Sequence, residues 1–303
     1  MLFQGCIIAR VGDYSQSTEL NLGYILGLLL QICNNPDRIA FNSLIDGDNE
    51  IYSMDLAGTE LQQLTFNSTS DTSPSWSPNG MQIAFQGNRL GVDGIYLINS
   101  DGSNERALVV DGFVNQLPAF APDGQGIYFA SNRGGSTQEI HHLDLNTFVI
   151  TQITNSAGAY DNVSPAVSPG SDYVYFNTTF SGNDDIARIR KDGSDFSVIV
   201  TDPNSDLEPA ISRDGTMLLL TADRDGNQEI YMAQPDGLNQ INFSSDGGND
   251  GAAAFSPDGR QIVFASDRPI SDQEIYTISM DGTGLTQLTS NSTLDTDPTW
   301  SCR

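Results

Sequence analysis

An apolar triplet recurs six times along the chain at nearly constant spacing, and this repeat limits the possible folds more than any other feature. Each triplet ends in Phe or Leu, and successive triplets are separated by 44, 44, 47, 44 and 44 residues. They are Ile39-Ala40-Phe41, Ile83-Ala84-Phe85, Ile127-Tyr128-Phe129, Val174-Tyr175-Phe176, Leu218-Leu219-Leu220 and Ile262-Val263-Phe264. A fixed period of roughly 40–50 residues indicates an array of equivalent structural units.

Each unit contains the signals of four short strands. A Pro-x-aromatic-Ser segment comes first, as in Pro74 to Ser77, and a turn such as Pro78-Asn79-Gly80 leads into the apolar triplet. An Ile-Tyr pair such as Ile95-Tyr96 marks a third strand, and an Asp-Gly turn such as Asp101-Gly102 leads to a fourth. Glycine supplies the positive φ that these hairpin turns need. Six units of four antiparallel strands predict an all-β chain that forms a single six-bladed β-propeller.

The repeat also resembles that of a known family. The order Asp-x-x-Pro-x-Trp-Ser-Pro-Asp-Gly, Ile-Ala-Phe-x-Ser-x-Arg, Glu-Ile-Tyr, Asp-Gly and Leu-Thr is similar to the TolB-type, WD40-like propeller repeat over roughly residues 37–303. That repeat occurs in a periplasmic translocation protein, in sensors and in the gating domain of prolyl-oligopeptidase-type hydrolases. The resemblance therefore implies a propeller fold and a scaffold or interaction role outside the cytoplasm, in the periplasm, at the cell surface or after secretion. It does not identify a partner.

The two ends of the array predict how the ring closes. Residues 288–301 repeat residues 64–77 with ten identities in fourteen, so the last unit continues into a first strand that no second strand follows. We expect this C-terminal strand, Pro298 to Ser301, to pair with Arg38 to Ser43, which leaves no exposed sheet edge. The segment Leu28 to Cys33 is the alternative partner. Closure by the C-terminal strand would also bring Cys302 close enough to Cys33 for a disulfide.

Residues 1–36 precede the repeat and form a predicted leader before the propeller of residues 37–303. The apolar run from Leu22 to Cys33 is too short to span a bilayer, so we expect no transmembrane span. Its length suits the core of a signal peptide, although acidic residues and a single cation precede it. A signal or anchor, an added strand and a disordered leader are the open alternatives.

The composition excludes several classes of function. Because 13 Lys and Arg stand against 39 Asp and Glu, the formal net charge is −26, and nucleic acids and anionic membrane surfaces should be repelled. The only histidines, His141 and His142, are neighbours whose side chains point to opposite faces of a strand, so they cannot bind one metal together. The chain also lacks the Gly-x-Ser-x-Gly motif of a serine nucleophile. We expect a monomeric, non-enzymatic propeller.

A polar residue stands three positions before the proline position of the first strand in every unit. These six residues, called the ring residues below, are Asp71, Asn115, Asn162, Asp206, Asp250 and Asp295. Sixfold repetition would gather their oxygens at one mouth of the central channel, where they could bind a protein or peptide, a basic one given the net charge. Ca²⁺ is the candidate cofactor, with Asp71, Asp206, Asp250 and Asp295 as its predicted ligands. The structural alternative is that each side chain accepts a hydrogen bond from a nearby backbone N–H.

Other charged positions favour structural roles. Four arginines share one place after the second strand, and we interpret them as partners of carboxylates on the same face; they are Arg89, Arg133, Arg224 and Arg268. The acidic loops 46–50 and 223–229 lack the glycine and distal glutamate of a calcium-binding hand, which favours solvated hairpin loops.

The predicted function is therefore non-catalytic binding of a protein or peptide at an acidic channel mouth. The alternative is a carbohydrate-active or other hydrolytic enzyme that uses acidic residues in the funnel. Two facing carboxylates, one with a raised pKa, would favour the enzyme.

Overall fold

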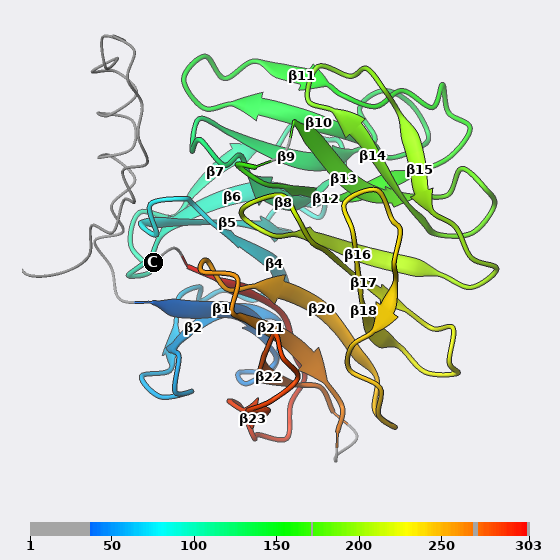
Figure 1. The fold of residues 1–303 in the computed structure, drawn as a ribbon. Helices are drawn as coiled ribbons and strands as arrows, with labels where there is room; N and C mark the ends of the chain where they lie inside the picture. The colour runs from blue at the N-terminus through cyan, green and yellow to red at the C-terminus, as the bar shows by residue number, and fades with distance from the viewer. Residues whose placement is uncertain (1–36, 171, 269–271, 302–303) are drawn as a thin grey trace, which may run out of the picture. The chain divides into compact units, whose positions relative to one another are not determined.

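Six four-stranded antiparallel sheets surround a common axis as the blades of a propeller (Figure 1). The computed structural model describes residues 37–170, 172–268 and 272–301, and these ranges contain 24 strands. Blade 1 consists of β24, β1, β2 and β3, and blades 2 to 6 follow in chain order from β4 to β23. The predicted six-bladed propeller is confirmed.

The strands occupy four layers from the axis outward. The innermost strands are β24 (Asp295–Trp300), β4 (Asp71–Trp76), β8 (Asn115–Phe120), β12 (Asn162–Val167), β16 (Asp206–Ile211) and β20 (Asp250–Phe255). The second strands are β1 (Arg38–Ser43), β5 (Gln82–Gly87), β9 (Gly126–Ser131), β13 (Tyr173–Thr178), β17 (Leu218–Ala222) and β21 (Gln261–Ser266). The third strands are β2 (Glu50–Asp55), β6 (Gly94–Asn99), β10 (Glu139–Asp144), β14 (Asp185–Arg190), β18 (Glu229–Ala233) and β22 (Glu274–Ser279). The outer strands are β3 (Gln62–Gln63), β7 (Arg106–Val109), β11 (Ile150–Gln152), β15 (Ser197–Val200), β19 (Ile241–Asn242) and β23 (Thr286–Gln287).

The last strand closes the ring beside the first. β24 pairs antiparallel with β1, with Trp300 opposite Ile39 and Asp295 opposite Ser43 (Figure 1). The Arg38 N–H donates to Ser301 Oγ over 2.7 Å, and the Ser301 N–H donates to the Arg38 carbonyl over 2.8 Å. Closure by the C-terminal strand is confirmed. The leader of residues 1–36, including the alternative strand Leu28 to Cys33, lies outside the described residues, as does Cys302.

The repeated triplets form the core. They lie in the second strands, where Phe41, Phe85, Phe129, Phe176 and Phe264 are among the largest fully buried side chains. Six apolar clusters each join two adjacent blades, so both faces of every second strand are covered. This arrangement explains why these strands are apolar without alternation. Within the described ranges, no helix has the length and apolarity needed to cross a membrane.

Every innermost strand contains a β-bulge at the same place. The third residue of the strand has a φ of 51–54° and the pairing register shifts there. These bulge residues are Ser73, Leu117, Ser164, Glu208, Ala252 and Asp297. None is glycine, and a left-handed conformation costs such residues roughly 1–2 kcal/mol each. A bulge redirects a side chain, and here it brings the third residue of each innermost strand to the channel wall.

Candidate functional site

A cavity of about 230 Å³ lies in the central channel, lined by all six innermost strands. Bulge residues and the residues that follow them form its wall, with proline after five of the six bulges. Only two bulge residues are charged, Glu208 in β16 and Asp297 in β24. No Lys or Arg is among the described residues that line this cavity. The cavity wall is therefore mostly apolar or neutral. Its negative charge lies on β16 and β24, which are separated by one innermost strand, β20.

Each of the two channel carboxylates accepts a hydrogen bond from the next blade. Glu208 Oε2 accepts hydrogen bonds from the Ala252 N–H at 2.6 Å and from the Thr221 hydroxyl at 2.9 Å. Asp297 Oδ2 accepts one from the Ser73 hydroxyl at 3.4 Å. Burial raises the pKa of Asp297 to about 6, and the Glu208 charge adds to the effect. Ala252 lies on the strand between them, so a small side chain leaves room for a ligand that contacts both carboxylates.

The raised pKa of Asp297 predicts a pH-dependent stability. The unfolded chain has a pKa near 3.9 at this position, so the folded protein binds more protons between about pH 4 and about pH 6. Stability from this group is therefore lost as the pH rises through that window. We expect Asp297→Asn to gain in melting temperature relative to the unmodified protein between pH 4 and pH 7. Asp281→Asn is the control, because hydrogen bonds from Thr283 lower the pKa of Asp281. Its contribution changes mainly below about pH 4, so the relative melting temperature of this variant should stay nearly constant between pH 4 and pH 7.

The ring residues lie at the start of the innermost strands, two positions before the bulges. Their side chains are 0–1% exposed and do not line the cavity. Sequence reasoning predicted the oxygens of these residues at one mouth of the channel. The bulges, which bring a later residue to the wall, leave no sequence signature. The available signal was a charged residue directly before proline in two units, Glu208-Pro209 and Asp297-Pro298. A ligand or metal role for the ring residues stays a prediction.

The four repeated arginines bind ring residues of their own blades, as the sequence interpretation expected. Arg89 Nη2 donates to Asp71 Oδ2 at 2.9 Å, and Arg133 Nη2 donates to Asn115 Oδ1 at 2.7 Å. Arg224 and Arg268 donate in the same way to Asp206 and Asp250, respectively. Three of the four predicted metal ligands are thus already paired with a guanidinium.

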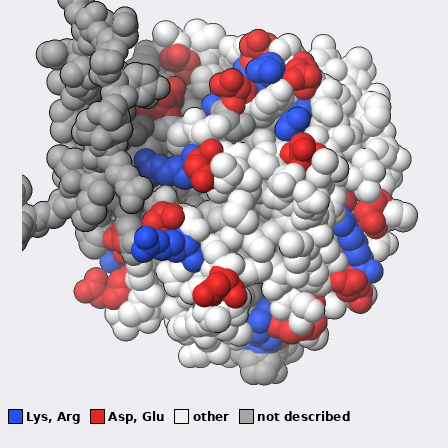
Figure 2. Space-filling view, in the orientation of Figure 1, with Lys and Arg blue, Asp and Glu red and all other residues white. Residues whose placement is uncertain are grey.

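Each of these arginines also meets an aromatic ring and an acidic residue other than the ring residue. The Arg224 guanidinium lies 4.8 Å from the centre of the Tyr231 ring and 3.9 Å from Asp202. Arg268 similarly lies over Phe264 and pairs with Asp246 at 2.5 Å. On the face drawn in Figure 2, basic side chains lie against acidic ones. A low-dielectric site strengthens such pairs, so the arginines explain how acidic residues are buried at the start of β4, β16 and β20.

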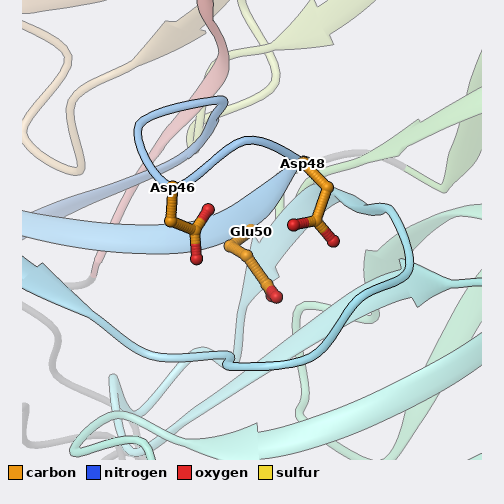
Figure 3. A group of neighbouring side chains, drawn as sticks. All are labelled: Asp46, Asp48 and Glu50. Atoms are coloured by element: carbon orange, nitrogen blue, oxygen red, sulfur yellow. The ribbon is translucent and has the colours of Figure 1, made fainter.

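A separate acidic group lies in the hairpin between β1 and β2 (Figure 3). Carboxylate oxygens of Asp46, Asp48 and Glu50 lie within 4.8 Å of one another, with Asp46 exposed and Glu50 buried. The Gln63 amide donates to Asp46 at 2.5 Å, and the Asn67 N–H donates to Glu50 at 2.6 Å. Burial raises the pKa of Glu50 to about 7. Because the protein already supplies donors to two of the three carboxylates, the group alone does not establish a metal site.

Part of the sequence is similar to TolB proteins. The family model for the TolB beta propeller domain matches residues 33–194. The "Tol-Pal system protein TolB" of Desulfosudis oleivorans is 43% identical over 54 residues, which cover 18% of this chain and 12% of that protein. The matched segment is therefore a small part of that relative.

Solved structures share the fold at low sequence identity. TolB from Acinetobacter baumannii superposes with a TM-score of 0.76 at 20% identity, over 88% of this chain and 67% of that one. An oligogalacturonate lyase from Vibrio parahaemolyticus superposes with a TM-score of 0.55 at 13% identity, over 82% and 72% of the two chains. TolB and a lyase thus share this architecture, and function must be argued from the site.

Proposed function

Because the chain belongs to the TolB β-propeller domain family, we propose that it is a non-catalytic, extracytoplasmic module that binds a basic peptide segment of a protein partner in its central channel. The observation that carries the proposal is the pair of carboxylates, Glu208 and Asp297, in a cavity wall that otherwise lacks charge. The buried ring residues support the mouth of the channel. We expect the bulge residues to contact the partner.

Charge and size both support a basic segment as the occupant. A net charge of −26 attracts cationic groups over a distance, and the effect is strongest at low salt. Inside the cavity, a Lys or Arg side chain can donate charge-assisted hydrogen bonds to either carboxylate. A cavity of about 230 Å³ admits side chains or an extended segment rather than a folded domain.

The test removes the channel charge without removing hydrogen-bond acceptors. Short labelled peptides that differ only in having Lys, Gln or Glu at alternate positions are titrated with the full chain, with fluorescence anisotropy as the readout. We expect the Lys peptide to bind most tightly. The double variant Glu208→Gln/Asp297→Asn should bind it at least roughly tenfold more weakly and with a smaller salt dependence, because two charge-assisted hydrogen bonds are lost.

The matched control removes the same charge from the outer surface. Glu60 and Asp172 have side chains that are 71% and 88% exposed, and neither lines the channel cavity. Glu60→Gln/Asp172→Asn should therefore retain most of the affinity for the Lys peptide. Equal losses in both double variants would show that net charge alone attracts the peptide, and the channel proposal would fail.

One observation favours a second candidate function, a carbohydrate-active or other hydrolytic enzyme. A pKa of about 6 at Asp297 beside Glu208 provides a proton donor and a base near neutral pH. Turnover of oligogalacturonides or aryl glycosides that disappears in both Glu208→Gln and Asp297→Asn would establish this function. Equal product formation by the unmodified protein and both variants would exclude it for those substrates.

A further inference from the structure

The end of the central channel opposite the ring residues has a different chemistry. The innermost strands start at the ring residues, and we call the end of the channel where these strands finish the far mouth. Two adjoining cavities of about 160 and about 300 Å³ lie there. The residues that line both cavities are Trp76, Val167, Pro169, Arg213, Phe255 and Pro257. Neither Glu208 nor Asp297 lines them, so the far mouth is separate from the proposed peptide site.

Ring-bearing side chains cover much of the far mouth. Trp76 ends β4, Trp300 ends β24 and Phe255 ends β20, and the chain contains no other tryptophan. Four prolines from the turns after innermost strands also line the smaller cavity; they are Pro78, Pro122, Pro169 and Pro257. Such flat, apolar surfaces favour a ligand that itself carries a flat ring, because aromatic rings gain from stacked and edge-on contacts beyond the burial of area.

Arg213 is the one charged side chain among the described residues that line the two cavities. It is exposed, and its guanidinium makes neither an ion pair nor a hydrogen bond with any described residue. The acid that follows it, Asp214, instead accepts hydrogen bonds from the hydroxyls of Ser212 at 2.7 Å and Thr216 at 2.8 Å in its own turn. The far mouth therefore offers a cation to which the described residues supply no anion.

This arginine departs from the repeat. The second residue after the innermost strand is proline in blades 2, 3, 4 and 6, and it is Arg213 in blade 5. Proline suits this place because it is favoured at the second position of a β-turn. In blade 5 the Gly215 N–H still donates to the Ser212 carbonyl at 2.8 Å, as the equivalent glycine does in blade 6. The turn thus does not require an arginine, and the exchange adds a positive charge to the far mouth.

We propose that the far mouth binds a small aromatic carboxylic acid, whose carboxylate pairs with Arg213 and whose ring packs against the two tryptophans. A guanidinium can bind a carboxylate through two parallel hydrogen bonds, which fixes the orientation of the acid. An inorganic anion would leave the rings uncovered, and a neutral aromatic compound would leave the guanidinium without a partner. An aromatic acid satisfies both features of the cavity walls.

The test uses tryptophan emission of the full chain, since both tryptophans line the far mouth. The protein is titrated with anthranilate and, separately, with anthranilamide, which has the same ring and amino group but no negative charge. Both compounds absorb light in the range where tryptophan emits, so a bound probe quenches that emission by energy transfer. We expect saturable quenching by anthranilate and at least roughly tenfold weaker binding of anthranilamide, because a charge-assisted pair is lost.

Variants of the arginine locate the carboxylate. Arg213→Pro copies the residue of four other blades, and Arg213→Gln keeps a hydrogen-bonding side chain without the charge. Each should bind anthranilate at least roughly tenfold more weakly and anthranilamide as the unmodified protein does. Arg260→Gln is the matched control, because Arg260 is exposed in the following turn of blade 6 and lines neither cavity. It should keep the affinity for anthranilate.

The double variant Glu208→Gln/Asp297→Asn tests whether this site is independent of the peptide site, and it should bind anthranilate no more weakly than the unmodified protein. Absence of saturable quenching by anthranilate would overturn the proposal. Equal affinities for anthranilate and anthranilamide would also overturn it, because apolar contact alone would then explain binding. Equal losses in Arg213→Gln and Arg260→Gln would reject it as well, since net charge would then control the affinity.

Discussion

Deletion of residues 295–303 is expected to abolish the cooperative unfolding of the propeller. The deletion removes β24, the innermost strand of blade 1, and leaves the edge of β1 unpaired. Trp300 is 8% exposed and packs in the cluster that joins blades 1 and 6, with Ile39 and Val263 among its members. Truncating a buried tryptophan costs about 3–5 kcal/mol, and the hydrogen bonds to β1 are lost in addition. The total is comparable with the whole stability of a typical domain, about 5–15 kcal/mol.

Differential scanning calorimetry and light scattering measure this effect. The shortened chain should lose its single sharp transition and associate through the open edge of β1. Deletion of residues 302–303 alone is the control, because it keeps β24 and should preserve the transition. A chain without β24 that melts as the full chain does would show that the ring does not depend on this closure.

Replacing Arg224 by methionine should destabilise the protein by about 3–5 kcal/mol, because the substitution leaves Asp206 buried without its cation. Burial already raises the pKa of Asp206 to about 6, and loss of Arg224 should raise it further. Since a protonated Asp206 carries no charge, the penalty should be small near pH 4 and should increase as the pH rises. Urea unfolding across this pH range measures the difference.

Blade 4 supplies the matched control for this substitution. It carries Asn162 and Phe180 at the positions of Asp206 and Arg224, so the double variant Asp206→Asn/Arg224→Phe copies a pair that this protein already contains. The double variant should recover most of the stability and lose the pH dependence. A single Arg224→Met variant within roughly 1 kcal/mol of the unmodified protein would show that the pair contributes no more than a surface ion pair does.

The channel site could be predicted only in part. The sequence identified which strands surround the axis, and it supplied the acidic character of the chain. It predicted partner contact at the ring residues, which are buried and in four blades bound to an arginine, and that role stays a prediction. Glu208 and Asp297 reach the cavity through bulges with positive φ. The neighbouring residues in the sequence do not predict a positive φ at a residue other than glycine. The partner arginines could be predicted because opposite charges recur in a fixed relation in four units.

The sequence by itself determined the six blades, their four strands and the closing strand, because each depends on a local pattern that repeats: an apolar triplet, a turn with glycine and a duplicated terminal segment. Only the tertiary structure decided which oxygens face the channel and which remain buried. That distinction depends on how one blade packs against the next, as in the contact between Glu274 of blade 6 and Asp295 of blade 1. Their burial arises from residues more than one strand apart in the chain. A local pattern carries no information about such contacts, since they form only when the ring closes.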